Sequence, residues 1–299
     1  MKSLYVLSDS EVTYTPDTKK DKMCTVYFPA DCKNNCKFCT SKAFYMENKP
    51  NPKKVLKWLR ALADSDVSEI VITGGEPMSD LDLLKEMLDI CKNKTVYINT
   101  TFLENGKDEF IKLVNSHKCV KGINISRHTI SYNNDSKFLN GIAHDEEILK
   151  IKTNVRINCF VGEKIDKKKM TQILNRWEPI WEQKKCHKLD VSFRHDYNKV
   201  VNENMHLLNT ESIVAATEVG NYYGRVYCHA CDKVLFKTKK GMDFRIHRGL
   251  PNTRVKIGNI IEMQELVLFP DGVLCTDWDK TQDGLKYYMK LLNIKKANN

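Results

Sequence analysis

Short apolar runs alternate with helix-like stretches six times between residues 24 and 193, and this alternation constrains the fold more than any other feature. Between the runs, apolar residues recur every three or four positions, as in Val55, Trp58, Leu59 and Leu62. Strands that alternate with helices predict an α/β fold built on a parallel sheet. Six runs are rich in strand-forming residues: 24–28, 69–73, 95–99, 120–126, 154–161 and 189–193.

The pattern changes after about residue 200, where short strand-like pieces are separated by turns such as Pro270-Asp271-Gly272. We therefore predict three segments. An N-terminal extension covers 1–22, the α/β core covers 23–200, and a small C-terminal α+β module covers 201–299. In a parallel sheet the functional loops follow the carboxyl ends of the strands, which is where we expect a site.

Composition narrows the class of protein. The chain has 299 residues, no apolar stretch long enough to cross a membrane and no visible secretory signal, so we expect a cytoplasmic protein without membrane partners. Its eleven cysteines favour metal ligation over a disulfide framework. The net charge of +10 suits an anionic partner, although abundant Lys throughout the chain explains it equally well.

Three cysteines lie within eight residues of one polar loop, as Cys32-x3-Cys36-x2-Cys39. Thiolates spaced in this way can converge on one metal centre, and iron–sulfur clusters are commonly held by four of them. Three cysteines without a local fourth leave one iron open to a non-protein ligand. Structural zinc is the alternative, but it usually has a fourth His or Cys nearby. Phe38 precedes the last cysteine and would shield one side of a cluster.

The string resembles the C-x3-C-x-aromatic-C motif of the radical S-adenosylmethionine (SAM) superfamily, placed just after the first core strand. The next strand ends in Thr73-Gly74-Gly75-Glu76-Pro77, which is similar to the superfamily's GGEP motif. Glycines let a backbone approach a ligand closely, here the amino group of SAM. A tight strand-to-helix turn is the alternative explanation of the two glycines.

The resemblance covers residues 24–195 and implies a partial (β/α)6 TIM-type barrel. It implies that Cys32, Cys36 and Cys39 hold a [4Fe–4S] cluster and that SAM binds its open iron. It also implies a reductant such as flavodoxin or ferredoxin, and a 5′-deoxyadenosyl radical that abstracts a substrate hydrogen. The expected activity is that of a radical SAM oxidoreductase or transferase.

Weaker similarities follow along the barrel. Thr100, in Asn99-Thr100-Thr101, resembles the third strand end beside SAM, and Ser126-Arg127 resembles the fourth, where a basic side chain could pair with SAM's carboxylate. Asn158 resembles a fifth-strand Asn of the molybdenum-cofactor-type cyclases. Each of these residues could equally be a satisfied polar group at a strand terminus. The implied cofactor-binding set is Phe38, Gly74, Gly75, Glu76, Pro77, Thr100, Ser126, Arg127 and Asn158.

A second cysteine set, Cys228-x2-Cys231 and Cys275, lies in the C-terminal segment. Its layout resembles the auxiliary-cluster extensions of the superfamily, the SPASM and twitch domains, although the full pattern of seven cysteines is not met. Zinc completed by His229 or His247 is one alternative. Thiols packed in a small core are another.

Several functions stay open. The likeness to the cyclase and the positive charge favour a nucleotide or nucleic-acid substrate, whereas the SPASM-like tail favours a ribosomal peptide. The chain ends in Ala297-Asn298-Asn299 rather than the cyclase family's Gly-Gly. An activase that installs a glycyl radical on a partner enzyme is a further alternative. A zinc-stabilised binding protein without catalytic activity is the non-enzymatic one.

Overall fold

The computed structural model confirms the α/β fold. It describes residues 5–8, 11–14, 22–30, 32, 36, 39, 41–42, 45, 49–127, 145–160, 166–184, 188–194, 204–228, 231–247, 254–257, 260–263 and 265–295. The six predicted strands all form, within one or two residues of the expected bounds. They are β3 (Met23–Tyr27), β4 (Glu69–Thr73), β5 (Thr95–Thr100), β6 (Val120–Ser126), β7 (Asn154–Phe160) and β8 (Leu189–Arg194).

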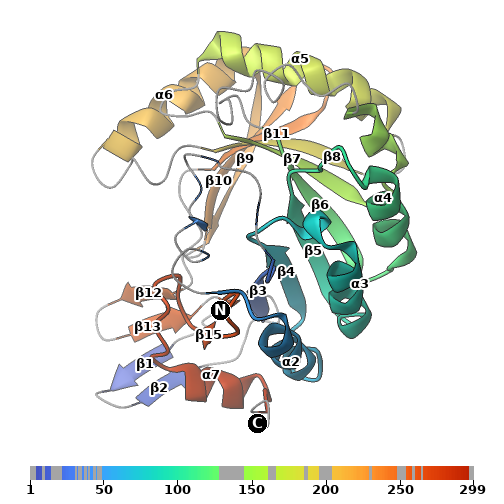
Figure 1. Cartoon of the computed structure of the whole chain (residues 1–299). Helices are drawn as coiled ribbons and strands as arrows, with labels where there is room; N and C mark the ends of the chain where they lie inside the picture. The colour runs from blue at the N-terminus through green and yellow to red at the C-terminus, as the bar shows by residue number, and fades with distance from the viewer. Residues whose placement is uncertain are drawn as a thin grey trace.

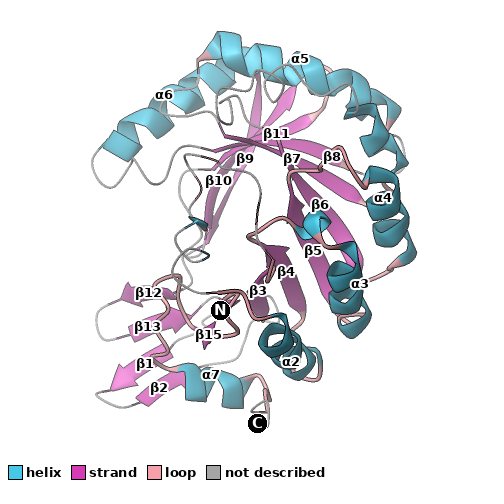
Figure 2. Ribbon diagram, viewed as in Figure 1, coloured by secondary structure: helices cyan, strands magenta, loops and turns pink. Residues whose placement is uncertain are grey.

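The helices lie on the outer side of a curved sheet (Figures 1 and 2). Side-chain caps begin several of them: Asn51 accepts from Lys54 N at 3.1 Å, and Asp80 accepts from Leu83 N at 2.9 Å. The helices are α2 (Pro52–Ala63), α3 (Leu81–Ile90), α4 (Lys107–Ser116), α5 (Lys167–Gln183) and α6 (Asn204–Val219), with 3-10 turns η1 (Pro77–Ser79) and η3 (Asp145–Lys150). The α5 helix continues through Pro179.

Strands from the C-terminal segment extend the core sheet at both edges. In the described part of the chain the strand order is β15-β14-β3-β4-β5-β6-β7-β8-β11-β10-β9, and every pair from β14 to β11 is parallel. The end strands are not paired with each other, so the barrel is open. The added strands are β9 (Gly220–Cys228), β10 (Cys231–Thr238), β11 (Asp243–His247), β14 (Glu265–Leu268) and β15 (Leu274–Cys275).

A second, antiparallel sheet combines strands from both ends of the chain. Its order is β12 (Arg254–Ile257), β13 (Ile260–Met263), β1 (Tyr5–Ser8) and β2 (Glu11–Tyr14), and α7 (Leu285–Leu291) packs beside β2. The predicted boundaries at 22 and 200 therefore divide the chain, while the sheets join segments from either side of them. The three-segment organisation stays a prediction.

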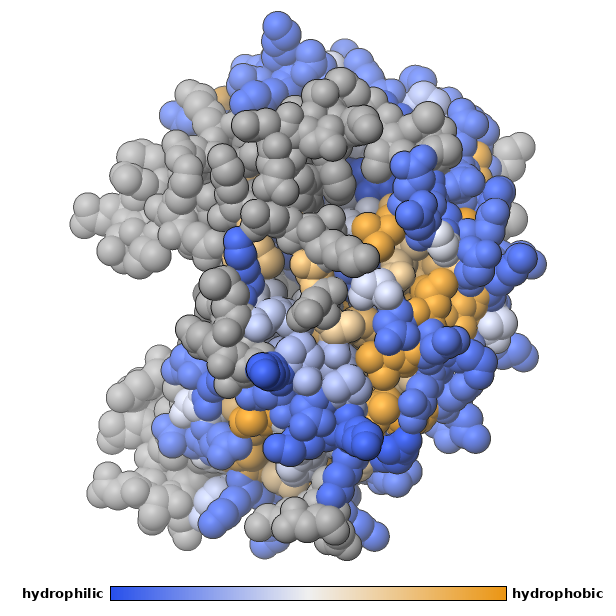
Figure 3. All heavy atoms as spheres, viewed as in Figure 1, coloured by the Kyte–Doolittle hydropathy of each residue, from blue (hydrophilic) through white to orange (hydrophobic). Residues whose placement is uncertain are grey.

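The two faces of the large sheet differ in chemistry. On the outer face the strands present buried residues such as Ile98, Ile157 and Val191, which form the main core with the helices. On the inner face the alternate positions are polar, for example Asn124, Arg156 and Asp190. Among the coloured residues in Figure 3, hydrophilic ones predominate, and hydrophobic ones gather near α3. The alternation of residues along the strands makes the inner face of the sheet polar.

Candidate functional site

The three clustered cysteines follow the carboxyl end of β3. Cys32, Cys36 and Cys39 are all half-buried, and Cys39 N donates to Cys36 O at 3.2 Å. Phe38, expected to shield the site, lies outside the described residues. The loop stands at the edge of the sheet where parallel strands present their functional ends.

The Gly74-Gly75 turn packs directly on the start of this cysteine loop. Both glycines have positive φ, +65° and +52°, which other residues rarely adopt. A Cβ on Gly74 would lie 2.0 Å from Tyr27 Cδ1, and one on Gly75 would lie 2.5 Å from the Ala30 carbonyl oxygen. The glycines are therefore required for close packing of two loops, in addition to any ligand that the turn contacts.

Glu76 ties the end of β4 to the end of β5. Its carboxylate is 2% exposed and accepts from the Thr100 hydroxyl (2.5 Å), Thr101 N (2.8 Å) and Met78 N (3.1 Å). Pro77 is the buried first residue of η1. The backbone N–H that proline lacks would have no partner within the turn at this position. Thr100 lies two residues after the core residue Ile98 on β5, so its side chain is on the same, outer face of the sheet.

Arg127 continues this network across the next strands. Its Nη1 donates to the carbonyls of Thr101 and Ser126, and the guanidinium lies 5.9 Å from the centre of the Phe102 ring. Its backbone N donates to Asn158 O at 2.9 Å. The structure thus brings the predicted residues of β4 to β7 to one edge, in strand order. Ser126 ends β6 at this edge, and His128 lies outside the described residues.

One layer deeper, amide side chains form a ladder on the inner face. Asn99 Nδ2 donates to Thr73 Oγ1 at 2.8 Å, and Asn124 Nδ2 donates to Asn99 Oδ1 at 2.7 Å. The ladder links β4, β5 and β6 beneath the strand-end loops. It fixes the spacing of those loops without using their own side chains.

Sequence reasoning missed a charged cluster on β7, β8 and β11. Asp190 is 5% exposed at its side chain and is bracketed by Arg156 Nε at 2.9 Å and an Arg245 Nη at 2.7 Å. Polar residues occupy every second position of these strands, as in Asp190, Ser192 and Arg194. Buried parallel strands usually read as continuous apolar runs, so this alternation was the signal of a polar interior.

His247 ends β11 on the same inner face. Burial lowers the pKa of its imidazole well below the ordinary value, and Arg194, Lys233, Arg156 and Arg245 lower it further through their charge. The ring is 3% exposed. A neutral imidazole surrounded by cations marks a region of positive potential.

The second cysteine set lies at opposite ends of the strand order. Cys228 pairs with Cys231 across the β9–β10 hairpin, whereas Cys275 lies on β15. Cys275 is buried in a cluster with Tyr27 and Phe269, its Sγ donates to Lys280 O at 3.4 Å, and burial raises the pKa of its thiol to about 12. The second metal site stays a prediction.

The donor side chains of the cysteine loop bear on which metal it can hold. Among the described residues, no three His, Cys, Asp or Glu side chains lie close enough together to hold a single metal ion. A four-iron cluster is larger than one ion and holds its thiolates further apart. Three half-buried cysteines on one loop are a donor set of the kind that holds an iron–sulfur cluster.

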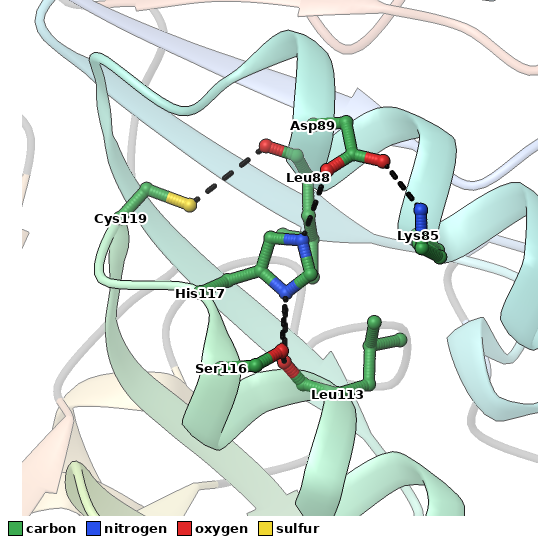
Figure 4. Close-up of polar contacts among 7 residues, drawn as sticks. All are labelled: Lys85, Leu88, Asp89, Leu113, Ser116, His117 and Cys119. Atoms are coloured by element: carbon green, nitrogen blue, oxygen red, sulfur yellow. Dashed lines mark hydrogen bonds and ion pairs between the residues drawn. The ribbon is translucent and has the colours of Figure 1, made fainter.

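A polar network between α3 and α4 belongs to the framework (Figure 4). His117 Nε2 lies 3.2 Å from Asp89 Oδ1, and its Nδ1 lies 2.8 Å from Leu113 O and 3.1 Å from Ser116 Oγ. The contact with Leu113 O places the ring at the carboxyl end of α4, where it caps the helix.

Four further cysteines in or next to the strands and helices are buried: Cys24, Cys91, Cys119 and Cys159. No helix in the described part of the chain is long and apolar enough to cross a membrane.

Residues 26–156 match the family model of the radical SAM superfamily, which confirms the resemblance seen in the two motifs. No match was found among curated protein sequences.

Solved structures of two proteins match this chain. SuiB of Streptococcus suis bound to its precursor peptide SuiA matches with a TM-score of 0.52 at 14% identity, over 85% of this chain and 58% of SuiB. The SAM-bound form of SuiB gives a TM-score of 0.47 at 18% identity over 67% of this chain and 48% of that one. The protein anSMEcpe with bound AdoMet gives 0.45 at 13% identity, over 66% and 60%. The chain spans about half to three fifths of the length of these proteins.

Proposed function

We propose that the chain is a radical SAM enzyme that uses SAM and a [4Fe–4S] cluster to modify a substrate by radical chemistry, since residues 26–156 match the radical SAM family model. When both are bound, they supply one-electron cleavage of SAM to methionine and a 5′-deoxyadenosyl radical. The observation that carries the proposal is the packing of Gly74 and Gly75 on the start of the loop with three cysteines.

The residues of the chain have different roles in this proposal. Cys32, Cys36 and Cys39 hold the cluster, and Gly74 to Pro77 form the adjacent turn. Glu76 and Thr100 are positioning residues, since their side chains bond to each other across two strand ends. Arg127 fixes three strand ends and adds a positive charge beside SAM's carboxylate. Ser126 and Asn158 contribute polar contacts on the inner side.

The substrate has two candidate classes. SuiB was solved with a precursor peptide, and its fold likeness favours a ribosomal peptide. The basic residues on the inner face of β7, β8 and β11 favour a substrate with an anionic part, such as a nucleotide. We further propose that Cys228, Cys231 and Cys275 are reserved for a second metal site, a cluster or zinc, and that flavodoxin or ferredoxin supplies the electron.

The proposal is tested by anaerobic reconstitution with iron and sulfide, followed by assay of 5′-deoxyadenosine release from SAM with dithionite. A Cys32/Cys36/Cys39→Ala variant should lose the SAM-cleaving cluster and the product. The matched control is Cys91/Cys119/Cys159→Ala, which removes three buried thiols away from the loop and should keep both. Undiminished product from the first variant, or wild-type protein that binds only zinc, would refute the proposal.

Iron that remains in the Cys32/Cys36/Cys39→Ala variant reports on the second site. About four irons per chain would support an auxiliary cluster. Zinc in their place would support the alternative. Neither metal in a folded variant would refute a second metal site.

A further inference from the structure

A row of polar side chains crosses three adjacent strands on the inner face. Asn158 of β7 is in register with Ser192 of β8, which is in register with Arg245 of β11. Arg194 and His247 lie two residues further along their strands, towards the carboxyl edge. Since β3, β7, β8 and β11 run parallel, this is also the edge that carries the cysteine loop.

Four atoms of this row are buried without a hydrogen-bond partner in the described part of the chain. They are Asn158 Oδ1, Ser192 Oγ, Arg245 Nε and His247 Nε2. A buried polar group without a partner costs about 1–3 kcal/mol, and native proteins contain few of them. Four such atoms on three neighbouring strands are therefore unlike the rest of the sheet, where inner-face side chains such as Asn99 bond to one another.

The charges of the row favour an anion. Asp190 pairs with both Arg156 and Arg245, so two guanidinium groups share one carboxylate. Arg245 uses an Nη for this ion pair, which leaves its Nε–H directed elsewhere. Burial and the surrounding cations lower the pKa of His247, and its Nε2 is one of the buried atoms without a partner; a neutral imidazole can donate one hydrogen bond to an anion through that nitrogen.

We propose that Ser192, Arg245 and His247 bind an oxyanion group of the substrate, a phosphate or a carboxylate. The proposal rests on the proposed function, because the row lies on the inner face at the strand-end edge that also carries the cysteine loop. Arg245 Nε–H, the Ser192 hydroxyl and His247 Nε2–H donate to the oxyanion. Asp190 is a positioning residue that orients the Arg245 guanidinium. Asn158 Oδ1 accepts from a neutral donor beside the oxyanion.

The test measures anion binding to the reconstituted full-length chain by its shift in thermal unfolding temperature. Sodium phosphate and sodium acetate are titrated separately against sodium chloride at equal ionic strength. Phosphate or acetate should raise the unfolding temperature of the wild type beyond the effect of chloride. The anion that does so identifies the group as a phosphate or a carboxylate.

Two variants examine the residues. Ser192→Ala should weaken the anion about 10-fold, and Arg245→Gln about 10- to 100-fold, because each removes a bond to a charged group. Ser192→Ala removes an atom that has no partner, so it should fold as well as the wild type. The control is Arg60→Gln, which removes an exposed arginine paired with Glu86 on the helices and should bind the anion normally.

Binding of SAM is measured on the same samples to separate this inference from the proposed function. Loss of anion binding in Ser192→Ala and Arg245→Gln with SAM binding retained supports the oxyanion site. No stabilisation of the wild type beyond chloride overturns it, as does equal stabilisation of the wild type and both variants. Failure of the wild type to bind or cleave SAM would count against the proposed function alone.

Discussion

The two halves of the strand-end edge use their buried polar groups differently. On β4 to β6, the Glu76 carboxylate, the Thr100 hydroxyl and the Arg127 guanidinium bond to one another's strand ends. On β7, β8 and β11, Ser192 and His247 carry buried atoms that have no partner in the described chain. On β4 to β6 the buried polar groups hold the strand-end loops in place. On β7, β8 and β11 some of them are free to bind a ligand.

Among the variants considered, Asp190→Ala should cause the largest loss in the free energy of unfolding, through the ion pairs of β7, β8 and β11. Removal of the carboxylate leaves Arg156 and Arg245 without their shared partner, and breaking a buried ion pair costs about 4 kcal/mol. Urea denaturation measures this loss. Asp108→Ala, which removes an exposed partner of Lys150, should change the free energy of unfolding by less than about 1 kcal/mol. Equal losses in the two variants would contradict a buried ion pair at Asp190.

Glu265 is a buried acid on β14, near the end of the sheet opposite β11. It allows the effect of a buried charge to be compared between the two sides of the sheet. Burial raises the pKa of its carboxyl from 4.5 to about 7, although the Thr25 hydroxyl donates to it at 2.8 Å. Between these pH values the folded chain keeps a proton that the unfolded chain has released. Stability should therefore fall by up to about 3 kcal/mol as pH rises from 4.5 to about 7, and then level off.

Denaturation of the wild type and of Glu265→Gln at several pH values measures this contribution. The Gln variant carries no charge at this position and should lose that part of the pH dependence. The same slope in both proteins between pH 5 and 7 would show that the carboxyl ionises normally in the fold.

Glu76→Ala should remove the hydrogen bonds that join the ends of β4 and β5, with a smaller loss in the free energy of unfolding. It leaves the donors of Thr100, Thr101 and Met78 without their acceptor, but they lie at the strand ends where water can reach some of them. We expect a loss of about 2 kcal/mol in the free energy of unfolding. The control Glu86→Ala removes an exposed carboxylate and should cost less than about 1 kcal/mol.

A pair of hydroxyl deletions gives the smallest and sharpest comparison. Thr100→Val removes a hydroxyl that donates to Glu76, and should cost about 1 kcal/mol. Ser192→Ala removes a hydroxyl with no partner, and should change stability by less than about 0.5 kcal/mol or increase it. Both values come from denaturant unfolding of the unliganded chain. A larger loss of unfolding free energy for Ser192→Ala than for Thr100→Val would contradict this comparison. It would mean that the Ser192 hydroxyl, and not the Thr100 hydroxyl, stabilises the fold.

Much of this fold could be predicted because its outer face obeys local rules. The core residues Ile72, Ile98 and Ile125 each lie in a short run rich in β-branched residues, which predicts a strand. The capping residues Asn51 and Asp80 mark where two helices begin. The pairing of β14 with β3 could not be predicted, since no local pattern connects Glu265 with residues some 240 positions earlier. Neither could the mixed second sheet, for the same reason.

The site divides in a similar way. Motifs identified the cysteine loop and the Gly74-Gly75 turn, because each is contiguous in the sequence. The role of Glu76 as a clasp on Thr100 depends on a contact between two strand ends, which spacing along the chain does not reveal. The polar row of Ser192, Arg245 and His247 needs β11 to pair with β8, although the alternation of polar residues in both strands was visible beforehand.

The pairing of β14 with β3 also sets an order of events during synthesis. On the ribosome β3 and the cysteine loop emerge early, but the strand that covers the β3 edge is made some 240 residues later. At about 5–20 residues per second this interval is roughly 10–50 s. Throughout that time β3 has an unpaired edge, and Phe269, which stacks on Tyr27 at 5.4 Å, is not yet present. A nascent chain should therefore place its cysteine loop in final form only after β14 and Phe269 have been made.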